Sequence, residues 1–357
     1  MNPHAVFCPN RDCPARGQVN EGTIWIHART PPRYRCTVCG RTFSDRAGTL
    51  YYRRSTAEAT ITCVVTLVAY GCPPAAIEAA FGVGRQTVAD WTDAAGGQCE
   101  AVHHHLVCQP RDLGAVQADE LRVKQQGRVV WVALAMQVAT RLWLGGAVSV
   151  RRDGALIARL LVLVRACALP APLVVCVDGF AAYVTQVRRM ARSPEPRDGR
   201  RGRCRLVAWP GLVIAQVVKQ RADRRVVGVT RRLAHGTRRW AKRLLGDGTI
   251  QTAYIERLNG TFRARLASLA RRTRGAGRTV TRLEAGMWLV GTVYNFCTPH
   301  RSLAREQTPA MAAGISDHVW SVDELLHYRV PPARWRAPTK WGRRTKAEQA
   351  LVERWAA

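Results

Sequence analysis

The sequence contains few acidic residues. It has 25 Asp and Glu against 55 Lys and Arg, which gives a formal net charge of +30 at pH 7. Such an excess favours nucleic acid as a partner, and an anionic membrane surface less specifically. The positive charge is densest in three stretches, Arg188–Arg205, Lys219–Arg243 and Arg257–Arg282. Charge runs are usually solvated surfaces, but these lie beside the candidate acids described below, so we predict that they follow a DNA duplex.

Long uncharged apolar runs and a secretory segment are also lacking. The most apolar long stretch, Ala155–Leu169, is interrupted by Arg159 and Arg165, so no membrane-spanning segment is expected. Without a secretory segment, the 12 cysteines are expected to be reduced thiols, some of them metal ligands, and not a disulfide framework. The expected compartment is the cytoplasm, in association with the nucleoid.

Internal repeats are absent as well, while apolar residues make up 47% of the 357 residues. This composition indicates a globular protein with about two or three domains. We predict an α+β multidomain chain. Its parts are a zinc ribbon in 1–50, a helix-turn-helix DNA-binding domain with a linker in 51–112, an α/β catalytic domain with a mixed sheet in 113–330, and a basic tail in 331–357.

Four cysteines form two pairs near the N-terminus, Cys8-x4-Cys13 and Cys36-x2-Cys39. Two thiolate pairs on short knuckles fit a tetrahedral zinc ion, and four cysteine ligands leave no open position for catalysis. Strand-like segments, Thr23–His27 and Arg33–Arg35, lie between the pairs. The pattern therefore predicts a structural zinc ribbon; the alternative is a set of unrelated buried cysteines.

A second group of potential ligands follows in the linker. On a helix Cys99 and His103 would share a face, next to His104, His105 and Cys108. This group could bind a second metal, or it could be a linker helix with solvated histidines. We favour the second interpretation.

Residues 55–95 predict three short helices, followed by a connector over 96–114 that carries two adjacent glycines. The helices Pro73–Phe81 and Arg85–Ala95 flank a turn at Gly82–Gly84, which is the arrangement of a DNA-reading helix-turn-helix. The start of the second helix is expected to meet bases or phosphates through Arg85, Gln86 and Thr87. Asp90 and Asp93 argue against uniform phosphate contact, and a helical hairpin that only packs is the alternative.

From Val116 the pattern changes to strands and helices of an α/β domain. A loop is expected over Ser193–Arg205, and a helix over Thr345–Ala356 in the tail. Strands are expected over Val116–Val123, Arg128–Met136, Arg141–Val150, Leu173–Val177 and Leu206–Val213, the first three as an antiparallel meander and the fourth as a central strand. Helices are expected over Ala155–Ala168, with Asp153 as its cap, over Ala181–Ala191, and over most of 252–295.

Three carboxylates stand out in this basic chain. Asp119 and Asp178 follow apolar runs that read as buried strands, and Glu256 lies on an arginine-rich helix. Burying a carboxylate is costly unless it is paired or binds a metal. Two-metal phosphoryl transfer needs several carboxylates that converge on two cations. Glu120 competes with Asp119 for the first position, but strand alternation sends their side chains opposite ways.

The helix that carries Glu256 has an apolar stripe at helical spacing. Its members are Ile255, Leu258, Phe262, Leu266 and Leu269. Glu256, Asn259 and Arg263 each follow one residue later and line the border of that stripe. This border can place Glu256 at the metals and Arg263 on a neighbouring DNA phosphate. The alternative is an ordinary surface helix with salt bridges.

Several motifs resemble those of insertion-sequence transposases that have a DDE, retroviral-integrase-like domain. The stretch Ala253–Arg263 resembles their last catalytic motif, and Tyr294–Leu303 followed by Thr308–Ala312 resembles their C-terminal signature. The segments around Asp119 and Asp178 look like the first two motifs. The resemblance spans nearly the whole chain to about residue 332, and its C-terminal half is the most specific.

The resemblance implies an RNase H-like catalytic domain, two Mg2+ (or Mn2+) ions, and cutting and joining of double-stranded DNA at terminal inverted repeats. It implies Asp119, Asp178 and Glu256 as metal ligands, with Asn259 and Arg263 as auxiliary residues. It also implies a homo-oligomer, since two ends must be held together. Two alternatives stay open: a catalytically decayed DNA-binding repressor, and a nuclease without joining activity.

The sequence departs from the resembled pattern in two places. Some relatives carry a histidine just ahead of the glutamate, where Ala253 and Tyr254 stand here. The lysine often found two turns later is Arg263, which keeps the charge without being equivalent. His300 of the C-terminal signature could be an active-site neighbour or a structural residue.

Overall fold

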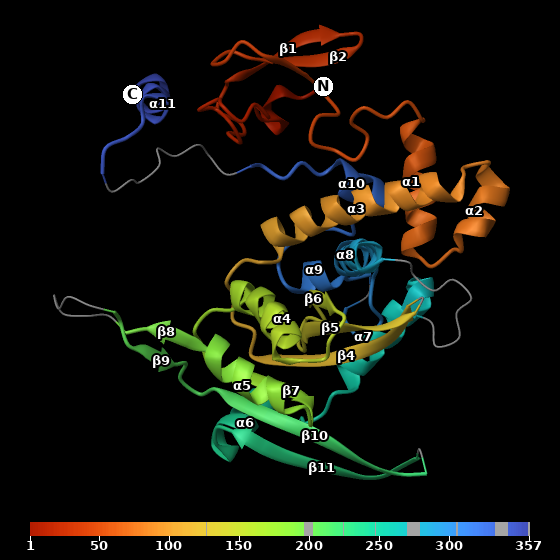
Figure 1. Cartoon of the computed structure of the whole chain (residues 1–357), viewed down its shortest axis with the longest axis vertical. Coiled ribbons are helices and arrows are strands. Elements are labelled where there is room, and N and C mark those ends of the chain that lie inside the picture. Colours follow the sequence, from red (N-terminus) through yellow and green to blue (C-terminus); the bar gives the residue numbers. More distant parts are fainter. Residues whose placement is uncertain are drawn as a thin grey trace. The chain divides into compact units, whose positions relative to one another are not determined.

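The computed structural model describes residues 1–125, 127–195, 203–223, 225–246, 248–269, 279–304, 306–332 and 342–355. Helices and strands are both present, so the predicted α+β class is confirmed (Figure 1). The chain forms two compact units, Met1–Glu58 with His327–Ala357, and Ala59–Leu326. In the described part of the chain, no helix combines the length and the apolar character needed to cross a membrane.

The smaller unit contains a three-stranded antiparallel sheet, which follows a short 3-10 helix η1 (Pro3–Ala5). Its strands are β1 (Ile24–Arg29), β2 (Pro32–Cys36) and β3 (Thr42–Ser44). Two of them match the strand-like segments predicted between the cysteine pairs, and the third follows the second pair. In the tail, α11 (Lys346–Trp355) confirms the predicted helix, whereas 333–341 lie outside the described residues.

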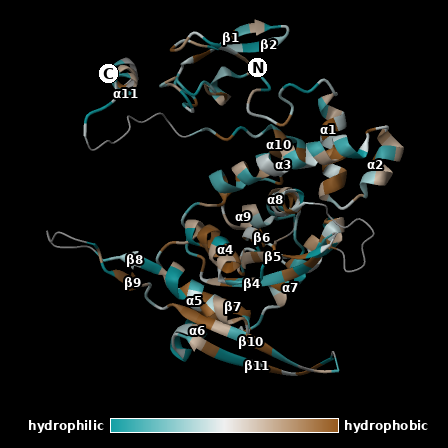
Figure 2. Cartoon of the chain, viewed as in Figure 1, coloured by the Kyte–Doolittle hydropathy of each residue, from teal (hydrophilic) through white to brown (hydrophobic). Residues whose placement is uncertain are grey.

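The larger unit is built on a six-stranded mixed sheet with the order β11-β10-β7-β4-β5-β6. The strands are β4 (Ala115–Gln125), β5 (Arg128–Gln137), β6 (Trp143–Ser149), β7 (Val174–Asp178), β10 (Val213–Ala222) and β11 (Arg225–His235). The predicted antiparallel meander is present in β4, β5 and β6. Strand β7 is parallel to both β4 and β10, which confirms it as a central strand. Its residues are mostly hydrophobic, as Figure 2 shows.

Helices cover both faces of this sheet. They include α4 (Gly154–Cys167), α5 (Ala181–Met190), α7 (Ala253–Arg265) and α8 (Val280–Cys297). Two adjacent glycines of β6 identify the faces, because neighbouring residues of a strand point opposite ways. A Cβ atom at Gly145 would lie 2.7 Å from Leu163 of α4, and one at Gly146 would lie 2.5 Å from Met287 of α8. Helix α4 begins with the predicted cap, because the Asp153 carboxylate accepts a hydrogen bond from the backbone N–H of Leu156.

The predicted connector over 96–114 is wrong in its first half. Helices α1 (Glu58–Ala69) and α2 (Pro74–Phe81) agree with the prediction, but α3 runs from Arg85 to Leu106 without a break. The glycines there do not end the helix. A Cβ atom at Gly96 would lie 2.4 Å from the carbonyl oxygen of Ala285, so this glycine lets α3 approach α8 closely. The helix-turn-helix segment therefore belongs to the same compact unit as the sheet.

The prediction of one strand over Leu206–Val213 is also wrong, because the structure has two separate strands there. The turn at Pro210-Gly211 separates β9 (Leu206–Ala208), which pairs with β8 (Arg192–Pro194), from the start of β10. The predicted loop over Ser193–Arg205 thus begins within a short strand, and its residues 196–202 lie outside the described ones. Strand β10 continues into a hairpin with β11 and then into α6 (Arg238–Leu245). Most of these residues lie in the stretch Lys219–Arg243, for which the sequence predicted only positive charge.

The C-terminal signature has a structural role in the larger unit. Asn295 of α8 is buried and bonds both backbone groups of Trp143 in β6, accepting from its N–H at 2.9 Å and donating to its carbonyl at 2.8 Å. The Thr308-Pro309 pair begins α9 (Pro309–Ala312), where the Thr308 hydroxyl accepts from the N–H of Met311. Two further elements complete the unit, η2 (Ala267–Leu269) and α10 (Val322–His327).

Candidate active site

The two candidate aspartates lie at the same level on neighbouring parallel strands. Gln117 of β4 pairs with Cys176 of β7, and continuing this register by two residues brings Asp119 opposite Asp178. Asp178 is the last residue of β7, and Asp119 lies within β4, as the predicted strand Val116–Val123 places it. Strand β4 continues beyond Asp119 because β5 still pairs with it there. The apolar runs therefore bring these two carboxylates together.

Glu256 lines the same cavity as these aspartates from α7, but it does not belong to the group of Asp119, Glu120 and Asp178, whose carboxylate oxygens lie within 4.8 Å of one another. This cavity of about 790 Å3 is lined by the three predicted acids Asp119, Asp178 and Glu256. Asn259 and Arg263, the other two residues on the border of the α7 stripe, line it as well. The spacing of these residues along α7 puts them on one side of the helix. All five residues singled out from the sequence thus share one cavity.

A buried glutamine fixes α7 against β4. The Gln117 side-chain oxygen accepts hydrogen bonds from the N–H groups of Tyr254 and Ile255, at 3.1 and 3.0 Å. These are the N–H groups that an N-cap residue normally satisfies, and Thr252 at the cap position makes no such bond. The Gln117 amide also donates to the carbonyl of Gln251 at 2.8 Å. The strand of Asp119 therefore holds the start of the helix that carries Glu256.

Each acid has a polar partner in the cavity. The Asn259 amide donates to Asp119 Oδ2 at 2.8 Å, which explains why an asparagine stands on this side of α7. Lys219 Nζ lies 2.5 Å from Glu256 Oε1, and the Thr252 hydroxyl donates to the same oxygen at 2.8 Å. Lys219 extends from β10, so the basic hairpin contributes directly to the site.

Arg152 forms ion pairs with two of the carboxylates, Asp178 and Glu120. Its Nη2 lies 2.8 Å from Asp178 Oδ2 and 2.8 Å from Glu120 Oε2. The guanidinium is held over the Phe180 ring, 4.4 Å from its centroid. Asp178 also accepts a hydrogen bond from the N–H of Phe180 at 2.8 Å. A cation that enters the cavity has to compete with this arginine and with Lys219, which pairs with Glu256.

Glu120 lies closer to the site than strand alternation suggests. Its side chain is 1% exposed and interacts with Tyr183 of α5, while Asp119 on the other side bonds to α7. The side chains of Asp119 and Glu120 therefore point to opposite sides of the sheet, as strand alternation predicts. Even so, one carboxylate oxygen from each of Asp119, Glu120 and Asp178 lies within 4.8 Å of the others, and this group could hold a metal ion.

The concentration of negative charge changes the protonation of Asp119. Burial raises the pKa of this carboxyl to about 7, and the nearby charges of Glu120, Asp178 and Glu256 contribute in the same direction. Burial also raises the pKa of Glu120. A cation would reverse this effect, because it favours the charged form of each ligand.

The donor set fits a hard divalent cation. Carboxylate oxygens are the ligands that Mg2+ prefers. One buried oxygen near the acids, Asn259 Oδ1, has no hydrogen-bond partner in the described part of the chain. Buried acceptors are normally satisfied, so this oxygen suits a cation or the water molecules around it.

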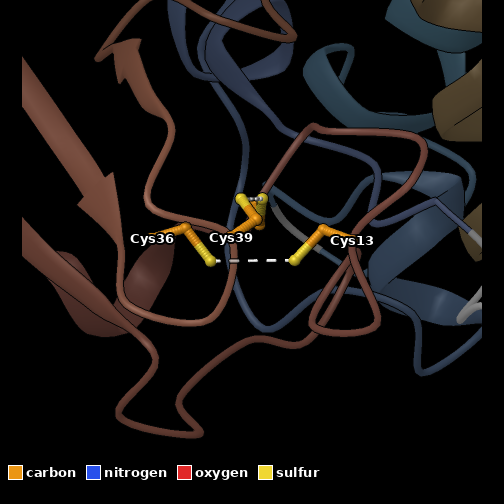
Figure 3. Close-up of side chains that lie close together, drawn as sticks. Cys13, Cys36 and Cys39 are labelled. Atoms are coloured by element: carbon orange, nitrogen blue, oxygen red, sulfur yellow. Dashed lines mark hydrogen bonds between the residues drawn. The ribbon is translucent and has the colours of Figure 1, made fainter. Parts of the chain in front are cut away.

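The four N-terminal cysteines meet as the sequence predicts. Their sulfur atoms all lie within 4.8 Å of one another, with Cys8 and Cys39 3.7 Å apart and Cys13 and Cys36 3.8 Å apart (Figure 3). A tetrahedron of sulfurs around zinc at about 2.3 Å has edges of about 3.8 Å, so the geometry fits zinc. Burial raises the pKa of Cys13 to about 11, which disfavours the thiolate unless a cation is bound.

The residues predicted to contact DNA are exposed at the start of α3. Two of them already have partners within the helical segment. Arg85 pairs with Glu78 of α2 at 2.5 Å, and the Gln86 amide donates to Asp90 at 2.6 Å. Exposed pairs of this kind contribute little stability and can exchange for a phosphate. Thr87, the next residue, is exposed as well.

Compared with known protein families and with curated proteins, the sequence matches none.

Neither His103 nor His300 lines the acidic cavity. His103 is buried between Trp143 and Trp288 and bonds the carbonyl of Leu144 at 3.2 Å, so it is not one of the solvated histidines expected there. His300 lies against Tyr294, with ring centroids 4.6 Å apart, and lines a different cavity.

Sequence reasoning missed three residues that shape the site: Gln117, Arg152 and Lys219. Gln117 had a detectable signal, since a polar residue inside an apolar strand needs a buried partner. Lys219 was hidden within a long basic run, and Arg152 follows another arginine directly before a helix cap. In neither case does the local sequence distinguish the residue from its neighbours.

Proposed function

We propose that this chain is a DNA transposase that cuts and joins phosphodiesters at the terminal inverted repeats of an insertion sequence. The observation that carries the proposal is the shared cavity of Asp119, Asp178 and Glu256, together with Asn259 and Arg263. These residues were selected from motifs far apart in the chain. Their meeting is what the resemblance to DDE transposases implies.

The architecture supports an RNase H-like catalytic domain of the kind those enzymes contain. A three-stranded antiparallel meander is extended by two parallel strands, β7 and β10, with helices on both faces. The first two acids lie on the adjacent central strands β4 and β7. The third comes from α7, which contacts β4 and β5.

Asp119, Asp178 and Glu256 would hold two Mg2+ or Mn2+ ions. When bound, such ions activate the attacking oxygen and stabilise the leaving oxygen of an in-line displacement. Asn259 orients Asp119 through its 2.8 Å hydrogen bond, and Gln117 keeps α7 in place. Lys219 and Arg263 supply positive charge on the cavity wall for the non-bridging phosphate oxygens.

The reaction proceeds in two chemically similar steps. Water first hydrolyses a phosphodiester at the element end and exposes a 3′-hydroxyl. That hydroxyl then attacks a phosphodiester of target DNA in line and displaces the 3′-oxygen of the target strand, which leaves as a hydroxyl. No side chain becomes covalently attached. The positive charge of +30 and the exposed start of α3 support duplex DNA as the substrate. The cysteine cluster would bind zinc and serve a structural role.

The direct test uses the wild-type protein with Mg2+ and a duplex that contains an element end. We expect strand cleavage at the end followed by joining to a second duplex. Release of ends without joining would support the nuclease alternative. Sequence-specific binding without cleavage in either Mg2+ or Mn2+ would contradict the proposal and favour a decayed repressor.

Metal binding is expected to depend on pH. Asp119 must lose its proton to bind a cation, and its pKa is raised to about 7. Below pH 7 the bound proton competes with the metal, so Mg2+ affinity should fall about tenfold for each pH unit; above about pH 8 this residue adds no further dependence. Calorimetric titration with Mg2+ between pH 5.5 and 8.5 measures it. Asp119→Asn should bind more weakly and lose this dependence, and an affinity for the wild type that is constant below pH 7 would contradict the assignment.

A further inference from the structure

A second, smaller cavity lies on the other side of α7 from the acids. Its volume is about 200 Å3. Tyr254, Arg257 and Thr261 of α7 line it, and their spacing places them on one side of the helix. The residues of α7 that line the acidic cavity occupy the other side. One helix thus separates two cavities of opposite chemical character.

The chemistry of the second cavity is that of an anion site. Three arginines line it, Arg141 from the turn before β6, Arg257 from α7 and Arg301 from the segment after α8. No carboxylate lines it among the residues that the structure describes. Guanidinium groups match phosphate oxygens through paired hydrogen bonds. Three of them around so small a volume favour a single phosphate group over a carboxylate or a neutral ligand.

Two further groups make this a built site and not a chance gathering of surface arginines. The Arg141 guanidinium is held over the Tyr254 ring, 3.7 Å from its centroid, and also donates to the carbonyl of Val138. His300 Nε2 is buried but has no hydrogen-bond partner in the described part of the chain. A buried ring nitrogen without a partner indicates that a ligand atom or water completes its hydrogen bonding.

We propose that this cavity binds a backbone phosphate of the DNA strand that enters the acidic cavity. The inference rests on the proposed function in taking DNA as the source of the phosphate. An α-helix with its side chains is about 10–12 Å wide, and successive nucleotides rise about 3.4 Å, so the bound phosphate lies about three nucleotides from the one that reacts. The cavity thereby sets the position of the strand along the acids. It also assigns a ligand to His300 and Arg301 of the C-terminal signature.

The test compares Arg257→Ala/Arg301→Ala with a matched double variant, Arg122→Ala/Lys124→Ala. The control removes two exposed positive charges from β4 of the same unit, and neither residue lines either cavity. Each protein is used at full length and without divalent metal. The first measurement is the rise in melting temperature with inorganic phosphate against chloride at equal ionic strength. The second is the affinity for a fluorescein-labelled duplex of arbitrary sequence as a function of salt.

We expect inorganic phosphate to stabilise the wild type and the control but not Arg257→Ala/Arg301→Ala. For DNA, the cavity variant should bind several-fold more weakly, and its plot of log K against log salt should be shallower by about one, while the control keeps the wild-type slope. Arg257→Lys/Arg301→Lys should regain the salt slope but only part of the affinity, because lysine cannot bind two oxygens at once.

Two outcomes would overturn the inference. Equal losses in the cavity variant and the control would show that only net charge matters. Loss of phosphate binding with unchanged DNA binding would assign the cavity to free phosphate. Neither measurement requires cleavage. If the protein binds phosphate and DNA as expected but never cleaves DNA, the proposed function is contradicted while the phosphate site stands.

Discussion

Replacing Asp178 by asparagine is expected to abolish strand cleavage while leaving DNA binding intact. Asp178 ends β7 opposite Asp119, and both line the acidic cavity. Asparagine can still accept the hydrogen bond from the N–H of Phe180, so the local turn should survive. It cannot supply the negative charge that a cation requires. Losing one hydrogen-bond donor in an active site costs about 100- to 1,000-fold in rate, and losing a metal ligand should cost about 1,000-fold or more.

The matched control is Asp153→Asn. It makes the same chemical change next to the site, but Asp153 caps α4, and asparagine caps helices nearly as well as aspartate. Cleavage is followed on a labelled duplex with an element end, and binding by gel shift in Ca2+. Wild-type cleavage rates in Asp178→Asn would refute the metal-ligand role. Loss of DNA binding in that variant alone would point to a structural defect.

Removing zinc is expected to unfold the smaller unit. Its core consists of the buried cysteines together with a few apolar residues, among them Val6, Ile24 and Tyr34. Zinc binding to such sites contributes about 10–16 kcal/mol in isolated peptides, comparable with the entire stability of a typical domain. Cys36→Ser should therefore lose the bound zinc and become sensitive to proteases within Met1–Glu58, while Ala59–Leu326 stays protected.

The exposed thiol of Cys63 provides the matched control, because Cys63→Ser makes the same substitution outside the cluster. Zinc content is measured by release onto a colorimetric chelator, and protection by limited proteolysis with mass spectrometry. A Cys36→Ser protein that retains one zinc per chain and the wild-type cleavage pattern would contradict the assignment.

The sequence was sufficient to select the acids because each lies on a strongly patterned element. The apolar runs before Asp119 and Asp178 form β4 and β7. Ile255, Leu258 and Phe262 of the predicted stripe lie on α7, whereas Leu266 and Leu269 lie beyond the end of that helix. Parallel pairing of β4 and β7 then brings the two aspartates to one level. The cysteine spacing was equally informative, because four thiols at those intervals satisfy one tetrahedral ion.

The features that the sequence did not predict depend on contacts between residues far apart in the chain. Gly96 suggested a break, yet its lack of a side chain serves the contact with Ala285 of α8. The hairpin of β10 and β11 was not recognised because β11 is largely exposed on both faces and carries arginines where alternation would show a buried side. Lys219 could be assigned to the site only once β10 was placed beside β7.

The hydrogen bonds of Gln117 also affect how freely this fold can vary. Because an amide on β4 holds the start of α7, the position of Glu256 does not depend on the chain that leads there from β10. Insertions into that intervening chain are therefore expected to leave the third acid in place as long as β11 and α6 still cover the buried cluster around Val174, Val213 and Ala241.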